Sequence, residues 1–220
     1  MPSDRVSSAS PWHVVFIIDD SGSMGVAQGA SSQVPAQQVN DALKAMVSEM
    51  EVIAKGTKPY FKISIVAFGS SAEIIVEAMS ERDIEIDNVA TFSGSHGTTR
   101  CSQAFRQAAD LLRRNPGAAT DFRPYVFFFS DGRPDSDDHA AAVQAASDLK
   151  AIDIPAGQPA VWAFGYGDLD SGFMKQICSN SEYFKELPDA SALTKLFPAI
   201  GTIAGTKTGE SAINTAIINL

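Results

Sequence analysis

The sequence predicts an α/β fold, a doubly wound and mostly parallel sheet with helices on both faces and one antiparallel edge strand. Two unbroken apolar runs, 14–18 and 125–129, lack polar alternation and are typical of central strands buried on both faces. Segments with helical periodicity separate most of the strand-like runs, as a parallel sheet requires. A three-residue connection, 69–71, predicts a hairpin at one edge of the sheet.

The expected elements follow one another in the order of a doubly wound sheet. A short apolar run is interpreted as a strand, and apolar residues that recur at helical spacing are interpreted as a helix. The expected order is strand 14–18, helix 35–54, strands 61–68 and 72–78, a helix after residue 99, strand 125–129, helix 138–150, strand 160–165, helix 171–178, strand 183–185 and helix 191–203.

Two connections and the chain end need separate interpretation. Only residues 69–71 separate strands 61–68 and 72–78, so these strands should be antiparallel and the second should lie at a sheet edge. Residues 80–95 have mixed charge and weak periodicity and predict an irregular connection. The last segment is weakly apolar, so that residues 212–220 either fray or form one more helix.

Composition predicts one soluble domain. The 220 residues, 45% hydrophobic and 20% charged, can bury a full core and leave no room for a second domain. We assign residues 12–204 to this domain, 1–11 to a flexible N-terminus and 205–220 to a C-terminal extension. Residues 1–11 lack the apolar stretch of a signal peptide and no later segment has membrane-spanning length, so we expect a cytoplasmic protein without membrane contact.

The charge balance disfavours nucleic acids and anionic membranes as partners. Acidic residues number 26 and Lys and Arg 17, which gives a formal charge of −9, and no basic cluster offsets it. The cysteines Cys101 and Cys178 have no metal-ligand spacing and are expected to be reduced core thiols. The glycines around Gly165 do not complete a dinucleotide fingerprint and the sequence has no phosphate-binding loop, so we expect no nucleotide cofactor.

Oxygen-bearing side chains follow the first strand at alternate positions. Asp19, Ser21 and Ser23 stand where this buried strand reaches the carboxyl edge of the sheet, the edge at which α/β folds bind ligands. Counting from Asp20 instead would place a glycine and a methionine at the alternate positions, and neither offers a hard donor, so Asp19 is the expected first ligand. An oxygen-only set suits Mg²⁺ or Mn²⁺ better than Zn²⁺, although the same residue types also build ordinary turns.

Two further segments strengthen the metal interpretation. Thr98 and Thr99 precede a helix whose apolar residues share one face, so a threonine hydroxyl stands at or just before the helix N-terminus. Asp131 follows the second buried strand and places another acid at the carboxyl edge. Taken alone, the threonine reads as a helix cap and Asp131 as a turn residue. The nearby acids Asp135, Asp137 and Asp138 could rim the metal site with negative charge, but for Asp137 and Asp138 solvated acids at a helix start are the favoured interpretation.

Together these segments resemble the von Willebrand factor A (VWA) domain and its metal-ion-dependent adhesion site, over roughly residues 12–203. That family joins Asp-x-Ser-x-Ser after its first strand to a Thr at a later helix start and an Asp-Gly after its fourth strand. The corresponding metal ligands in this sequence are Asp19, Ser21, Ser23, Thr99 and Asp131. Thr99 is preferred to Thr98 because the family usually has an Ala five positions after the ligand, and Ala104 fits.

The resemblance implies a Rossmann-like fold and a protein-interaction module that is not an enzyme. In such domains a divalent cation, here Mg²⁺ with Mn²⁺ or Ca²⁺ as alternatives, bridges to an Asp or Glu of a protein partner. Within the family, the chain is most similar to small intracellular bacterial members found with tellurite-resistance and stress-response proteins (TerY-like), through residues 97–105 and 182–187. Such members are thought to act as scaffolds. The sequence predicts neither the identity of the partner nor the oligomeric state.

Three features depart from the family pattern. Asp20 stands where a small or apolar residue is usual, and its charge could shift metal affinity or choice. Thr98 replaces the second Gly of Gly-Gly-Thr and leaves a second hydroxyl that could compete as a ligand. Segment 25–35 is longer than the usual turn and reads as a mobile loop or as part of a partner's footprint. His96, close to the threonine ligand, reads as a solvated side chain or a hydrogen-bond partner.

Two alternative functions remain open on sequence grounds. Phosphatases of the haloacid dehalogenase type also carry a strand-end Asp, which acts as the nucleophile of a metal-dependent phosphohydrolase. Those enzymes place a second acid two positions later, where this sequence has Ser21, and the proposed ligand set contains no Lys to neutralise a phosphoryl group. The other alternative is a structural VWA domain with an empty metal site, and titration with metal separates it from the binding module.

Overall fold

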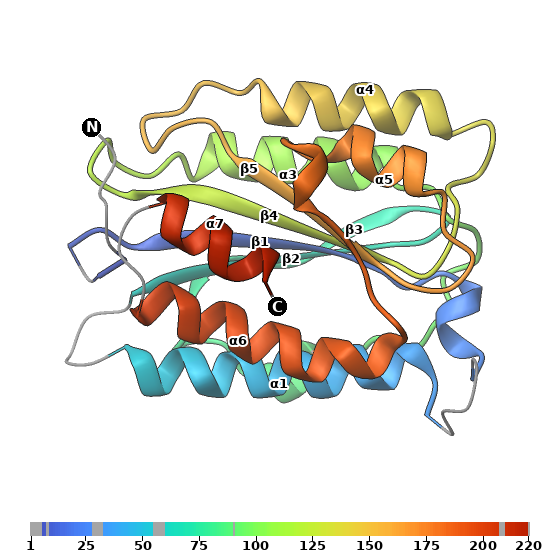
Figure 1. Cartoon of the computed structure of the whole chain (residues 1–220), viewed down its shortest axis with the longest axis horizontal. Helices are drawn as coiled ribbons and strands as arrows, with labels where there is room; N and C mark the ends of the chain where they lie inside the picture. Colours follow the sequence, from blue (N-terminus) through green and yellow to red (C-terminus); the bar gives the residue numbers. More distant parts are fainter. Residues whose placement is uncertain are drawn as a thin grey trace.

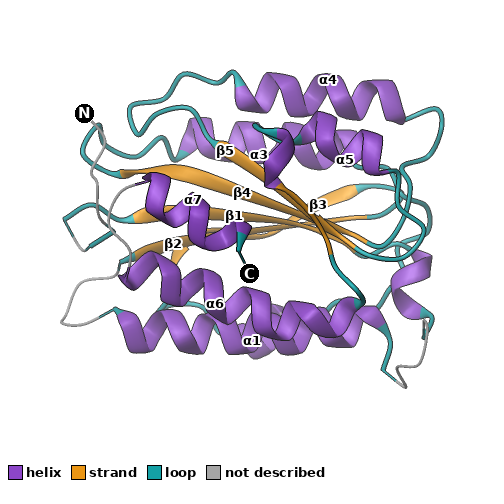
Figure 2. Cartoon of the chain, viewed as in Figure 1, coloured by secondary structure: helices purple, strands orange, loops and turns teal. Residues whose placement is uncertain are grey.

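The protein has the predicted α/β fold. The computed structural model describes residues 6–7, 9–27, 33–54, 60–89, 91–206 and 210–219. A central sheet lies between two layers of helices (Figure 1). Figure 2 shows the same layers, with the strands in the middle of the molecule and the helices outside them.

The sheet has the order β3–β2–β1–β4–β5–β6, and every neighbouring pair is parallel except β2 with β3. This antiparallel pair confirms the hairpin expected at residues 69–71 and places β3 at a sheet edge. The strands are β1 (Trp12–Asp19), β2 (Phe61–Phe68), β3 (Ala72–Ser80), β4 (Phe122–Ser130), β5 (Ala160–Gly165) and β6 (Phe184–Glu186).

Helices cover both faces of the sheet. On one face, above the sheet in Figure 1, α3, α4 and α5 pack against one apolar cluster, and α1, α6 and α7 pack against a second cluster on the other face. The helices are α1 (Pro35–Ile53), α2 (Ile86–Val89), α3 (Ser102–Arg114), α4 (His139–Lys150), α5 (Ser171–Ile177), α6 (Leu193–Thr206) and α7 (Glu210–Ile218).

Strand β1 is the centre of the sheet and positions the carboxyl edge. All its side chains are buried, and alternate ones enter the two apolar clusters, as the unbroken apolar run predicts. Its parallel pairing with β4 sets Ile18 opposite Phe129. Asp19 and Ser130 therefore end two neighbouring strands at the same edge of the sheet.

Several elements end at other residues than the sequence predicts. β3 continues to Ser80, two residues beyond the expected end. α3 begins at Ser102, and Thr99 lies in the segment just before it, in agreement with one of the two expected positions. The described residues between Ser80 and residue 95 form the expected irregular connection apart from the short helix α2, and Glu210–Ile218 form the helix α7.

A buried apolar side chain and hydrogen bonds of Asn214 hold helix α7 on the sheet. Ile217 is fully buried. The Tyr125 hydroxyl donates to Oδ1 of Asn214 at 2.5 Å, and Nδ2 of Asn214 donates to the Tyr183 hydroxyl at 2.7 Å. The segment that we expected to be an extension thus contributes side chains to the core.

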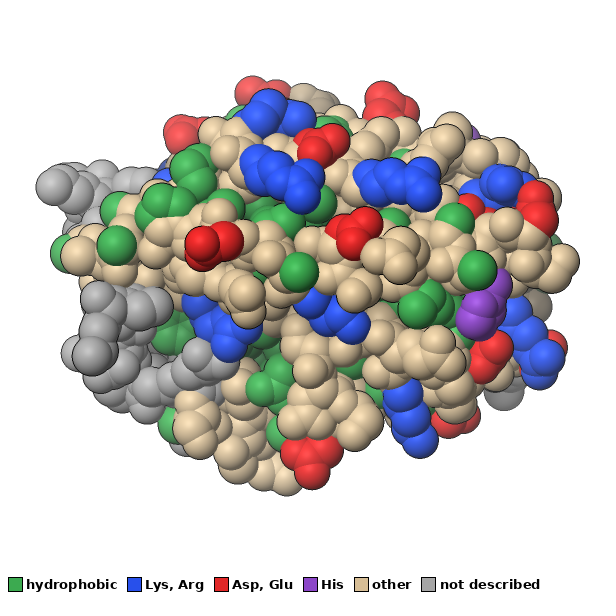
Figure 3. Space-filling view, turned by 90° about the horizontal axis from the view of Figure 1, so that it is seen from above, with side chains coloured by type: hydrophobic (Ala, Val, Ile, Leu, Met, Phe, Trp, Pro, Cys, Tyr) green, Lys and Arg blue, Asp and Glu red, His purple; other side chains and the backbone are tan. Residues whose placement is uncertain are grey.

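The charged groups on the α3–α4–α5 side are of mixed sign. Figure 3 views the molecule from this side, and Lys and Arg side chains alternate there with Asp and Glu side chains. Among the described residues on this face, neither sign gathers into one patch. No helix in the described part of the chain has both the length and the apolar character needed to cross a membrane.

Candidate metal-binding site

The two predicted acids lie at the carboxyl ends of β1 and β4. Asp19 is the last residue of β1, and Asp131 directly follows β4. Their exposed fractions are 0% and 3%, so both carboxylates are buried. The parallel pairing of the two strands brings them to one place, although 112 positions separate them in the sequence.

The Asp19 carboxylate is fixed by two donors. The Ser21 backbone N–H donates to Oδ1 at 2.8 Å, and the Ser130 hydroxyl donates to Oδ2 at 2.6 Å. The pKa of Asp19 is raised to about 7, because burial and, to a lesser extent, the neighbouring charge of Asp131 outweigh the opposing effect of these hydrogen bonds. Without a cation, the ionised form of Asp19 is therefore disfavoured.

Three hydroxyls join the two acids. A short turn of 3₁₀ helix, Gly22–Gly25, brings the Oγ atoms of Ser21 and Ser23 to 3.2 Å from each other. The Thr99 hydroxyl donates to Ser21 Oγ at 3.3 Å, and the Ser23 hydroxyl donates to Asp131 Oδ1 at 2.7 Å. All five side chains predicted as ligands thus belong to one set of contacts.

The geometry distinguishes Thr99 from Thr98. Thr99 is half-buried beside Ser21, whereas the Thr98 hydroxyl lies 3.4 Å from Ser70 Oγ on the exposed side of the segment. Thr98 therefore points away from the acids.

Asp20 belongs to a different set of contacts from Asp19. Its carboxylate is 2% exposed, accepts hydrogen bonds from the backbone of Ser93 and Gly94, and lies 2.6 Å from Nδ1 of His96. Gly94 has a φ of +66° and packs against Gly25, where a Cβ would approach the Gly25 nitrogen to 1.9 Å. Asp20 thus fastens the 93–96 segment to the loop after β1, and His96 is its hydrogen-bond partner.

The sequence reasoning missed two residues of the site. Ser130 holds Asp19, and its place between a buried strand and Asp-Gly could have indicated this role. Tyr166 follows β5, and its hydroxyl donates to Met24 Sδ at 3.2 Å. Burial raises the pKa of Tyr166, and the charges of Asp131 and Asp19 raise it further, so this ring lies within electrostatic reach of both acids. No sequence pattern pointed to Tyr166.

One expectation for the neighbouring acids was wrong. Asp138 was expected to be solvated, but it is only 3% exposed. Its carboxylate is satisfied inside the protein, because it accepts hydrogen bonds from both the backbone N–H and the hydroxyl of Ser102. Asp137 has an exposed side chain, as expected.

The donor set fits a hard divalent cation. Two buried carboxylates with three hydroxyls offer only oxygen, which Mg²⁺, Mn²⁺ and Ca²⁺ prefer. A cation would also offset the cost of holding two acids in a buried place. Among the described residues, no group of three or more His, Cys, Asp or Glu side chains is arranged to hold a metal ion, so the hydroxyls are an essential part of this candidate.

The chain belongs to the von Willebrand factor type A domain family. The model of this family matches residues 13–199, which include all five candidate ligands. No significant match is found among curated protein sequences.

Solved structures share the fold at low sequence identity. The pilus adhesin SpaC of Lactobacillus rhamnosus GG superposes with a TM-score of 0.73 at 15% identity, over 89% of this chain and 31% of the adhesin. A von Willebrand factor type A protein of Catenulispora acidiphila gives a TM-score of 0.67 at 16% identity, over 89% and 43% of the two chains. Proximal thread matrix protein 1 of the mussel byssus, with a zinc-occupied adhesion-site motif, gives a TM-score of 0.63 at 18% identity, over 96% of this chain and 47% of the matrix protein. This chain spans less than half the length of each.

The raised pKa of Asp19 predicts a pH dependence of stability without metal. Because the folded protein keeps the Asp19 proton up to about pH 7 while the unfolded chain releases it near 3.8, stability should fall as pH rises between these values. The gap corresponds to at most about 4 kcal/mol. In the presence of a chelator, Asp19→Asn should therefore gain stability over the wild type at pH 7 relative to pH 4, as measured by urea unfolding.

The comparison with the wild type removes an opposing contribution. Burial lowers the pKa of His13 to about 4, so His13 stabilises the fold as pH rises through the same range in both proteins. An equal stability difference between Asp19→Asn and wild type at pH 4 and pH 7 would contradict the raised pKa.

Proposed function

We propose that the protein is a metal-dependent protein-interaction module in which Asp19, Ser21, Ser23, Thr99 and Asp131 hold Mg²⁺, with Mn²⁺ or Ca²⁺ as alternative ions. The observation that carries the proposal is the convergence of these five side chains at the carboxyl edge, with both acids buried, Asp131 bonded to the Ser23 hydroxyl and Asp19 bonded to the Ser21 backbone N–H. The zinc-occupied adhesion-site motif of the mussel matrix protein supports metal binding by a protein of this fold.

The residues divide into a buried base and an open rim. Asp19, Ser21 and Asp131 are buried, whereas Ser23 is exposed and Thr99 is half-buried. A divalent cation bound here supplies a positive charge that a carboxylate from outside can reach. Ser130 and the Ser21 backbone N–H hold the Asp19 carboxylate in place, so that its orientation is set before any ligand arrives.

The partner is proposed to be a protein that presents an Asp or Glu. Three neutral hydroxyls leave room for a further anionic ligand at a divalent cation, and a carboxylate is the anionic oxygen ligand that proteins carry. The family membership of the chain and its likeness to a pilus adhesin and a matrix protein agree with an interaction role.

We propose that the module is not an enzyme. A phosphohydrolase of the haloacid dehalogenase type needs an acid two positions after its nucleophile. Ser21 occupies that position, and its hydroxyl is within hydrogen-bonding distance of Ser23 and Thr99. The metal-loaded protein should hydrolyse no member of a phosphoester panel, and turnover that Asp19→Asn abolishes would reverse this proposal.

The proposed cellular setting is the bacterial cytoplasm, in a scaffold for a stress or tellurite response. The support is the similarity of residues 97–105 and 182–187 to TerY-like proteins. Recovery of the native protein from the cytoplasmic fraction, together with stress-response genes beside its own, would support this setting. Recovery from the cell surface would contradict it.

The two neighbouring threonines provide a matched test of the metal site. Thr99→Val should weaken Mg²⁺ or Mn²⁺ binding at least about 10-fold, because it removes a ligand oxygen without changing side-chain shape. Thr98→Val should bind the ion as the wild type does, since the Thr98 hydroxyl faces Ser70. Isothermal titration calorimetry measures both. If the wild-type protein bound neither ion at millimolar concentration, the metal-binding proposal would be refuted, and the domain would be a structural one with an empty site.

The carboxylate preference can be tested without the natural partner. N-acetyl-aspartate amide should shift the amide NMR resonances of Ser23 and Thr99 when Mg²⁺ is present and should not shift them when a chelator replaces it. N-acetyl-asparagine amide is the matched neutral probe and should have no effect. Equal shifts with both probes, or shifts that persist without metal, would refute metal bridging to an acid.

A further inference from the structure

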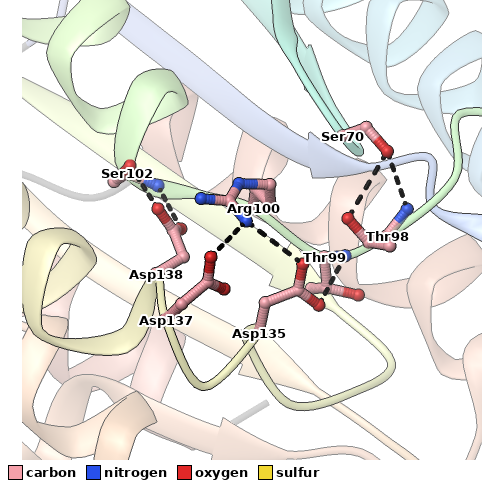
Figure 4. A network of polar contacts seen from close by, with 8 residues as sticks. All are labelled: Ser70, Thr98, Thr99, Arg100, Ser102, Asp135, Asp137 and Asp138. Atoms are coloured by element: carbon pink, nitrogen blue, oxygen red, sulfur yellow. Dashed lines mark hydrogen bonds and ion pairs between the residues drawn. The ribbon is translucent and has the colours of Figure 1, made fainter.

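The two loops that carry Thr99 and Asp131 are tied together by acids that are not candidate ligands. Asp135, Asp137 and Asp138 follow Asp131 and reach across to residues 99–102, at the start of α3 and just before it (Figure 4). The three acids make different contacts there, and only one of them touches the backbone of the candidate ligand Thr99.

Asp135 is that acid. Its backbone N–H donates to the Thr99 carbonyl oxygen at 2.9 Å, and the Thr99 N–H donates to its carboxylate Oδ1 at 3.4 Å. Asp135 therefore engages Thr99 on both sides of the residue. Its side chain is 29% exposed, which limits competition from water.

Asp137 contacts the same segment without reaching Thr99. Its carboxylate accepts a hydrogen bond from Arg100 Nη1 at 2.8 Å, and its side chain is 68% exposed. The other oxygen of Asp135 lies 3.8 Å from the same guanidinium nitrogen. Exposed ion pairs of this kind contribute little to stability, so Asp137 is a natural control for the loss of one negative charge.

Asp138 anchors the far end of the connection. It accepts from the backbone N–H of Ser102 at 2.9 Å and from the Ser102 hydroxyl at 2.5 Å, and both residues are buried. This contact fixes the start of α3 against the start of α4. The segment between Thr99 and Ser102 is thus held at both ends by the loop that carries Asp131.

We propose that Asp135 is a positioning residue for the metal site: it holds the Thr99 backbone so that the Thr99 hydroxyl lies beside the Ser21 hydroxyl before a cation binds. This inference rests on the proposed metal-binding function. Asp135 acts through Thr99, and the reason is geometric, because rotation of the Thr99 backbone would carry its hydroxyl away from the other donors.

The test compares three variants that separate hydrogen bonding from charge. Asp135→Ala removes the acceptor for the Thr99 N–H, Asp135→Asn keeps an acceptor oxygen but removes the charge, and Asp137→Ala removes one nearby charge without touching Thr99. The full chain is titrated with Mn²⁺ by calorimetry. In parallel, hydrogen exchange of the Thr99 amide is measured in the metal-free protein.

Asp135→Ala should weaken Mn²⁺ binding about 2- to 12-fold, the change expected for one lost hydrogen bond, and should speed exchange of the Thr99 amide. Asp135→Asn and Asp137→Ala should stay within about twofold of the wild-type affinity, and the metal-free melting temperature of all three variants should remain close to that of the wild type.

Three outcomes would overturn the inference. If Asp135→Ala and Asp137→Ala weakened Mn²⁺ binding equally, charge alone would matter. The same would follow if Asp135→Asn weakened Mn²⁺ binding as much as Asp135→Ala does. Unchanged Thr99 exchange in Asp135→Ala would show that the carboxylate does not hold the amide. Wild-type protein without Mn²⁺ binding would instead overturn the proposed function, and the role of Asp135 in metal binding with it.

Discussion

The burial of the Asp19 carboxylate is the constraint on which the site depends. An ionised acid at a fully buried strand end is costly unless hydrogen bonds or a positive charge compensate it. Ser130 and the Ser21 backbone N–H supply the hydrogen bonds, but the pKa of Asp19 is still raised. A divalent cation held by Asp19 and the hydroxyls would supply the missing compensation, and the proposed interaction with a partner would use the same cation.

The sheet makes this constraint possible. Buried apolar side chains on both faces of β1 hold the strand at the centre, and its parallel pairing with β4 ends both strands at one edge. The loops beyond that edge must then meet. Their contacts, from Asp20 to the 93–96 segment and from Asp138 to Ser102, hold the candidate ligands in a shared position around Asp19.

Sequence reasoning succeeded where the signal is local. Unbroken apolar runs predicted β1 and β4, and a three-residue connection predicted the β2–β3 hairpin. It did not predict contacts between side chains that lie far apart in the sequence. Asp20 lies just beyond the end of β1, and its carboxylate meets His96 and the backbone of the 93–96 segment, which no local pattern links to it. The burial of Asp138 depends on Ser102, which no periodicity links to it.

The most direct measurement of the central claim is anomalous diffraction from crystals grown with Mn²⁺. We expect one strong anomalous peak between the carboxylates of Asp19 and Asp131, within coordination distance of hydroxyl oxygens from Ser21, Ser23 and Thr99 or of waters that they hold. A peak at another place on the molecule, or no peak at saturating Mn²⁺ with this edge of the sheet free of crystal contacts, would contradict the account.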